Sequence, residues 1–158
     1  MKSIIAFCVL AATLTLSACA ALSSRNDPMC PPLRSFVASV MPDESRAISF
    51  HTIWGGNFKG QAESVIFAKR CIHDGYVPAK PICKYLTEHG ATEFAGRNAQ
   101  RAISCLADRT KFDSQIQFSR GVFRFSYGTP DRGSLVEIEF GDDKEVGGEL
   151  MRINADGY

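Results

Sequence analysis

Apolar side chains recur at helical spacing in the first part of the chain after residue 30. Pro31-Pro32 can open a helix, because the first helical turn tolerates proline. The apolar positions that follow have the i, i+3, i+4, i+7, i+8 spacing of one helix face: Leu33, Phe36, Val37, Val40 and Met41. We expect Pro42-Asp43 to end this first helix.

Two more helices are predicted in the middle of the chain. Residues 79 to 89 have a helical pattern, and Gly90 is expected to act as the C-cap. Residues 93 to 107 carry a second apolar stripe, with the Thr92 hydroxyl available as an N-cap. Residues 62 to 72 fit either a helix or a strand, with a slight preference for helix.

Alternation with a period of two predicts strands in two regions. In residues 46 to 54 the side chains expected on one face are Ile48, Phe50, Thr52 and Trp54. After residue 115 the phase changes between Ile116 and Phe118 on one side and Phe123, Phe125 and Tyr127 on the other. A bulge or tight turn at Arg120-Gly121 would account for that slip.

The last third of the chain continues as strands joined by turns. Val136, Ile138 and Phe140 predict one strand, and Met151 with Ile153 predicts another. The whole pattern predicts an α+β fold, in which a helical middle packs on one face of a mainly antiparallel sheet that ends in a C-terminal β-meander.

The N-terminus carries a pattern of a different kind. The short positive start Met1-Lys2-Ser3 precedes an uncharged apolar run over residues 4 to 16, which is shorter than a membrane-spanning helix needs and typical of a signal peptide. The run ends in Leu16-Ser17-Ala18-Cys19, which resembles the lipobox of bacterial lipoproteins. An ordinary secretory signal, cut near Ala18 or Ala20 and leaving Cys19 unmodified, is the alternative.

The lipoprotein resemblance implies a location. In that class the peptide is cut before the cysteine, so residues 1 to 18 would be removed and lipid on Cys19 would hold the protein on a membrane. Residues 19 to 29 are then a lipidated tether, and residues 30 to 158 form a single periplasmic domain. Ala20 stands where an aspartate would favour the inner membrane, which implies the periplasmic face of the outer membrane.

Charge and cysteine content limit the partners and the compartment. Without residues 1 to 18 the chain has 17 basic and 17 acidic residues, so it lacks the basic excess that nucleic-acid binding needs. Four cysteines then remain besides Cys19: Cys30, Cys71, Cys83 and Cys105. In an oxidising compartment an even number predicts two disulfides, which stabilise the domain.

Three pairings of these cysteines are possible. If the two middle helices form a hairpin around Gly90, Cys83 and Cys105 lie at different heights. On that argument we expect Cys71 to pair with Cys105 and Cys30 with Cys83.

No catalytic or metal-binding motif is predicted. Cys71-Ile72-His73-Asp74 places a thiol beside an imidazole and a carboxylate, but a disulfide would remove the thiolate that a nucleophile requires. Cys71, His73, Cys83 and His89 match no zinc spacing. The chain is therefore expected to be no enzyme and to need no cofactor.

Two features suggest binding instead. The C-terminal hairpin is rich in carboxylates, which could meet a basic partner and steer its association: Glu137, Glu139, Asp142, Asp143 and Glu145. The aromatic and glycine-rich loop from Ile53 to Phe58, which holds the only tryptophan, could also be a contact, with Trp54 and Asn57 as its candidate residues. A solvated acidic face and a core tryptophan are the simpler alternatives.

Location and missing chemistry together favour a protein-binding function. The first hypothesis is an immunity or inhibitor protein that neutralises a periplasmic hydrolase, such as a secreted cell-wall hydrolase or toxin. The alternative is a structural accessory of outer-membrane or envelope assembly. An enzyme is the least favoured class.

Overall fold

The computed structural model describes residues 26–61, 65–110, 112 and 117–158. The predicted signal peptide, the lipobox with Cys19 and most of the predicted tether lie outside the described residues. Asp27 and Met29 already belong to the packed domain, because Met29 is fully buried and Asp27 forms an ion pair with Arg101. No helix in the described part of the chain is long and apolar enough to cross a membrane.

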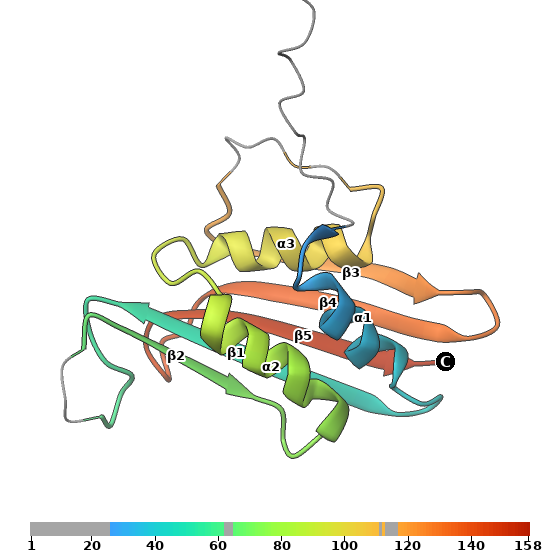
Figure 1. Ribbon diagram of the computed structural model, residues 1–158, viewed down its shortest axis with the longest axis horizontal. Helices are drawn as coiled ribbons and strands as arrows, with labels where there is room; N and C mark the ends of the chain where they lie inside the picture. Colours follow the sequence, from blue (N-terminus) through green and yellow to red (C-terminus); the bar gives the residue numbers. More distant parts are fainter. Residues whose placement is uncertain (1–25, 62–64, 111, 113–116) are drawn as a thin grey trace, which may run out of the picture.

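The fold is α+β, as predicted, with three helices on one face of a five-stranded antiparallel sheet (Figure 1). The helices are α1 (Cys30–Ala38), α2 (Lys80–His89) and α3 (Gly96–Leu106), and a short 3-10 turn, η2 (Val77–Ala79), precedes α2. The strands are β1 (Ser45–Trp54), β2 (Phe67–Ile72), β3 (Gly121–Gly128), β4 (Gly133–Asp142) and β5 (Glu149–Gly157). Their order is β2-β1-β5-β4-β3, so the last three form the predicted meander.

The apolar core lies between the helices and the sheet. Directly opposed residues of antiparallel strands point to the same face, and the register aligns Ile48 with Ile153 and Ile153 with Ile138 across β1, β5 and β4. All three are almost completely buried. Helix α1 contributes Leu33, Phe36 and Val37 to the same core.

The segment with the ambiguous pattern is a strand where it is described. The slight preference for helix over residues 62 to 72 is wrong for Phe67–Ile72, which pairs with β1 at the edge of the sheet. Hydrogen bonding to a neighbouring strand overrides a weak local propensity here. The consequence is that Cys71 lies directly opposite Phe50 and faces the helices.

Helix α1 ends earlier than predicted, and its last expected core residue is exposed. The helix stops at Ala38, and Met41, beyond it, is 55 % exposed. The four other residues of the predicted stripe are buried, as expected.

The two middle helices form, and Gly90 is the C-cap of α2, as predicted, donating from its N–H to Leu86 O at 2.8 Å. The predicted Thr92 cap of α3 does not form. Gly90 follows α2 in an extended conformation (φ −63°, ψ 144°) instead of the left-handed one. A Cβ at Gly90 would lie 2.7 Å from the Phe50 ring, so close packing requires the glycine. Helix α3 begins at Gly96 without a side-chain cap. The loop before it is held by the buried Asn98, whose side chain accepts from Ala91 N and donates to Ala91 O, both at 2.8 Å.

The phase slip after residue 115 is produced by a bend before the strand. The chain bends at Ser119 and Arg120, and β3 starts at Gly121. Phe118 therefore reaches the core side although it is out of phase with Phe123; the two ring centroids lie 5.6 Å apart. Ile116 lies outside the described residues.

Both predicted disulfides are present, but the predicted pairing is wrong. Cys30 pairs with Cys105, which joins α1 to the end of α3, and Cys71 pairs with Cys83, which joins β2 to α2. The physical reason is the strand at Phe67–Ile72: it lies under α2, so Cys71 meets Cys83 directly. The Cys30–Cys105 bond follows from the packing of α1 against α3, where Arg34 Nε also donates to Cys105 O.

Candidate functional site

The most distinctive cavity lies at the end of the sheet where the β4–β5 hairpin meets the end of β1. Its volume is about 360 Å³. We call this site the acidic pocket. Its lining includes Thr52, Trp54, Glu93, Asp142, Asp143 and Glu149. It unites two sequence-predicted features, because Trp54 and the hairpin residues Asp142 and Asp143 lie in the same cavity.

The register of three strands builds the floor of the acidic pocket. Thr52 of β1 is directly opposite Glu149 of β5, and Glu149 is directly opposite Asp142 of β4. Opposed residues point to the same side, so the three form one row across the sheet on its helix-covered face. Glu93, in the loop between α2 and α3, completes the acidic lining.

Trp54 is a surface residue beside this row. Its side chain is 54 % exposed, which overturns the alternative of a core tryptophan. It stacks on Phe67 of β2, itself 51 % exposed, with ring centroids 6.3 Å apart and planes 7° from parallel. The two rings form an exposed aromatic pair at the edge of the sheet.

The carboxylates of the acidic pocket are close to one another. Burial raises the pKa of Glu149, and the neighbouring Asp142 charge raises it further. Among the described residues, Glu93, Asp142 and Glu149 form no ion pair with Lys, Arg or His. The pocket therefore concentrates negative charge that no ion pair within the described part of the chain neutralises.

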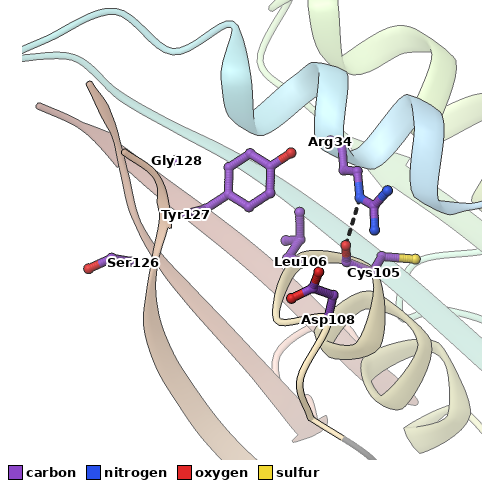
Figure 2. A pocket seen from close by; sticks show the side chains of 7 residues that line it. All are labelled: Arg34, Cys105, Leu106, Asp108, Ser126, Tyr127 and Gly128. Carbon is purple, nitrogen blue, oxygen red and sulfur yellow. Dashed lines mark hydrogen bonds between the residues drawn. The ribbon is translucent and has the colours of Figure 1, made fainter. Parts of the chain in front are cut away.

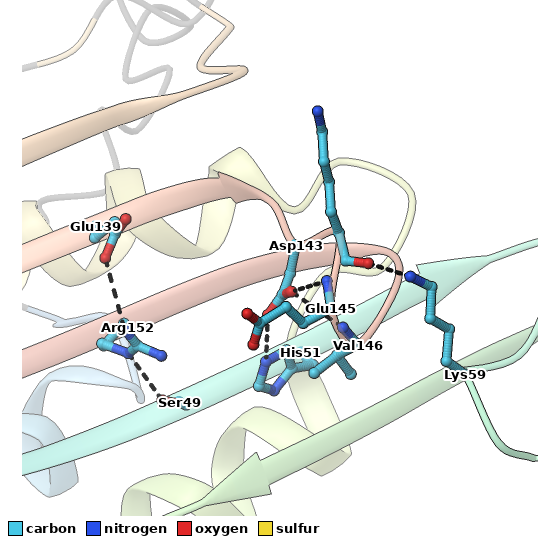
Figure 3. Close-up of polar contacts among 9 residues, drawn as sticks. Ser49, His51, Lys59, Glu139, Asp143, Glu145, Val146 and Arg152 are labelled. Carbon is cyan, nitrogen blue, oxygen red and sulfur yellow. Dashed lines mark hydrogen bonds and ion pairs between the residues drawn. The ribbon is translucent and has the colours of Figure 1, made fainter.

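Asp143 differs from the other carboxylates of the pocket because it is fully engaged (Figure 3). One oxygen accepts from Glu145 N and Val146 N at 2.8 and 3.1 Å, and the other lies 3.2 Å from His51 Nε2. These backbone bonds, above all that from Val146, lower the pKa of Asp143. Asp143 thus fixes the hairpin turn and is not a free contact charge.

His51 is the buried partner of Asp143 and was missed by the sequence analysis. It lies on the sheet face opposite the helices, yet it is only 3 % exposed. The β1–β2 loop covers it with Phe58, whose ring centroid is 6.3 Å away, and is anchored to the hairpin by Lys59 (Figure 3). Burial lowers the pKa of His51.

The other predicted contact residues lie away from the pocket. Glu137 and Glu139 face the side of the sheet without helices, where Glu137 pairs with Arg124 and Glu139 lies 3.9 Å from Arg152. Glu145 is exposed on the hairpin turn, and Asn57 accepts from Val65 N inside its own loop at 3.1 Å. The hairpin is therefore not one uniform acidic surface.

A second, polar cavity of about 550 Å³ lies beside the Cys30–Cys105 disulfide (Figure 2). Arg34 enters it from α1 and donates from Nε to Cys105 O at 2.8 Å, which satisfies a carbonyl in the last turn of α3. Asp108 and Tyr127 also line it. The charged side chains that line this cavity are Arg34 and Asp108. Arg34 has a structural role, because it binds the Cys105 carbonyl.

Neither cavity presents a recognisable catalytic or metal-binding arrangement. No group of three or more His, Cys, Asp or Glu side chains in the described ranges could hold a metal ion. All four cysteines of the domain are in disulfides, so Cys71 offers no thiolate beside His73 and Asp74. No protein-family model, curated protein or solved structure matches the chain.

Proposed function

We propose that this chain is a lipid-anchored envelope protein that acts by binding a protein partner, with the acidic pocket in the contact surface. The observation that supports the proposal is the pocket itself, where Asp142 and Glu149, which form no ion pair among the described residues, lie beside the exposed Trp54. Tryptophan is enriched at the energetic centres of interfaces, and unpaired charge steers the encounter with an oppositely charged partner.

The proposed partner is a secreted hydrolase or toxin, and the proposed role is that of an immunity or inhibitor protein. A small domain with two disulfides is suited to the oxidising periplasm, where such a partner would act. The proposed location is the periplasmic face of the outer membrane, with lipid on Cys19.

The lipid anchor predicts a clear effect of Cys19→Ser. The wild-type chain should lose residues 1 to 18 and fractionate with membranes, because several acyl chains on one residue give stable attachment. The variant should accumulate as an unprocessed or soluble form. Membrane fractionation and the intact mass of the mature protein check both points. A mature N-terminus other than Cys19, without added lipid mass, would contradict the lipobox assignment.

The binding function predicts a stoichiometric partner with an activity to inhibit. Tagged full-length protein, recovered from detergent-solubilised envelope, should carry a hydrolase, and adding the purified protein should inhibit that hydrolase at a one-to-one ratio. The double variant Asp142→Asn/Glu149→Gln should bind and inhibit the hydrolase at least about tenfold more weakly, since desolvated charge pairs in an interface contribute strongly to the affinity.

The matched control is Glu137→Gln, which removes a carboxylate from the opposite face of the sheet and should leave inhibition unchanged. Recovery of an outer-membrane assembly complex without any hydrolase would refute the inhibitor role and support the structural-accessory alternative.

A further inference from the structure

We infer that the acidic pocket receives the guanidinium group of an arginine side chain that the partner presents. This inference deepens the proposed function and rests on it for the origin of the arginine. The chemistry of the pocket, however, can be tested with a small molecule alone.

The row of residues that forms the floor of the acidic pocket carries two neighbouring negative charges. Asp142 and Glu149 are directly opposite each other on neighbouring strands, and like charges in such positions repel. Burial above all, and then the charge of Asp142, raises the pKa of Glu149. Lys69, opposite Thr52 on β2, could have supplied a counterion but forms no ion pair with them. A cation from outside would relieve the repulsion.

A buried hydroxyl group without a hydrogen-bond partner among the described residues also lies in the pocket, and it points to a ligand independently of charge. Thr52 belongs to the same row and is only 1 % exposed, yet its Oγ1 has no hydrogen-bond partner among the described residues. A buried hydroxyl without a partner is unfavourable in a folded protein. Because Thr52 lines the pocket, a donor that enters could supply the missing hydrogen bond.

The lining of the pocket suits a guanidinium group better than other cations. The described residues contain no grouping that would hold a metal ion, so an organic cation fits better. A guanidinium is planar and has five N–H donors, which suit several carboxylate oxygens and one hydroxyl at once. The indole of Trp54 adds a flat wall on which that plane can stack.

The carboxylates elsewhere on the hairpin show why this site is distinct. On the opposite face, Glu137 and Glu139 have Arg124 and Arg152 as neighbours. Those arginines offset the charges of Glu137 and Glu139, whereas Asp142 and Glu149 form no ion pair among the described residues. Arg97 lines the adjoining cavity together with Glu93 and Glu149, but among the described residues it forms no ion pair with either. These carboxylates therefore remain available to an arginine of a partner.

The test uses Trp54, the only tryptophan of the chain, as an internal reporter. The full chain in a neutral detergent is titrated with N-acetyl-arginine amide, and with N-acetyl-citrulline amide as the uncharged analogue of the same shape, at constant ionic strength. Arginine amide should change Trp54 fluorescence saturably, with a dissociation constant in the millimolar range. Citrulline amide should bind at least about tenfold more weakly, because it lacks the charge.

Variants separate the pocket from a general electrostatic effect. Asp142→Asn with Glu149→Gln should abolish the arginine response, and Thr52→Val should weaken it several-fold. Glu137→Gln with Glu139→Gln, which removes the same charge from the opposite face, should leave it unchanged. Glu149→Gln alone should raise the melting temperature, since it removes one of two like charges at a partly buried position, so loss of binding in this variant cannot be loss of fold.

Two results would overturn the inference: equal responses to arginine and citrulline amides, or an unchanged arginine response when Asp142 and Glu149 are replaced. The proposed function fails separately. If arginine amide binds the pocket but no hydrolase is recovered, the pocket stands and the inhibitor role does not. If a hydrolase is inhibited equally by the pocket variant, the role stands and the arginine site does not.

Discussion

Replacing Cys30 and Cys105 together by alanine is expected to lower the free energy of unfolding by about 4 kcal/mol. The Cys30–Cys105 disulfide closes a loop with a sequence separation of 75 residues, whereas the separation between Cys71 and Cys83 is 12. In the chain-entropy account a longer loop restricts the unfolded chain more, so the shorter disulfide should contribute only about 3 kcal/mol. A loss of 4 kcal/mol is a large part of the stability of a typical domain, about 5–15 kcal/mol.

Urea unfolding of both double variants, Cys30→Ala/Cys105→Ala and Cys71→Ala/Cys83→Ala, measures the difference. The second pair is the matched control, because it also removes two thiols and one cross-link. A larger loss for the Cys71–Cys83 pair would contradict the loop argument. Peptide mapping without reduction checks the connectivity itself: a fragment that links Cys30 to Cys83 would overturn the pairing.

Periodicity predicted the elements of this fold better than it predicted their contacts. The alternation in β1, β4 and β5 and the helical stripe before Pro42 identified the buried faces, because one face of each element meets the same core. The meander was predictable since short turns join consecutive strands. Residues Phe67–Ile72 were ambiguous because an edge strand buries little and therefore carries a weak pattern.

That one ambiguous segment explains the wrong disulfide pairing. The expected Cys71–Cys105 bond assumed that the two middle helices form a hairpin and that Cys71, just before it in the sequence, lies near Cys105. Only the antiparallel pairing of β2 with β1 reveals that Cys71 points at α2. Such pairing depends on contacts between segments that are distant in the chain, and no local pattern records them.

The candidate site was predicted in pieces but not as a whole. Trp54 and the hairpin carboxylates were both identified from sequence, yet only the strand order places β1 beside β5 and brings them into one pocket. Alternation predicted that Glu137 and Glu139 share a face, but their arginine neighbours come from other strands. Alternation placed Thr52 on the same strand face as Trp54, but nothing in the sequence marked it as part of a site. Glu93 had no sequence signal, because a single loop glutamate is an ordinary residue.

Asp143→Ala is expected to lower the free energy of unfolding by about 2–3 kcal/mol near neutral pH. The substitution removes the acceptor for two backbone N–H groups of the hairpin turn and leaves the buried His51 without its partner. Lost hydrogen bonds to a charged group, with a buried polar group left unpaired, each contribute about 1–3 kcal/mol. Glu145→Ala is the matched control on the same turn: its side chain is exposed, so the change should stay within about 0.5 kcal/mol.

The pH dependence of unfolding distinguishes the His51–Asp143 pair from a mere turn contact. Burial lowers the pKa of His51 below its ordinary 6.5. As the pH falls, the imidazole of His51 is therefore protonated in the unfolded chain before it is protonated in the folded chain. Stability is then fully present above about pH 6.5 and falls as the pH drops towards the folded-state pKa, with a slope of at most about 1.4 kcal/mol per pH unit for one proton. The charges that face His51, Asp143 on one side and Arg70 and Arg152 on the other, shift this window without reversing its direction. His51→Gln should flatten the dependence of the free energy of unfolding on pH between pH 7 and 5. The control His89→Gln, at the exposed end of α2, should retain the slope of the wild type. Equal slopes in the wild type and His51→Gln would refute the role of the buried imidazole.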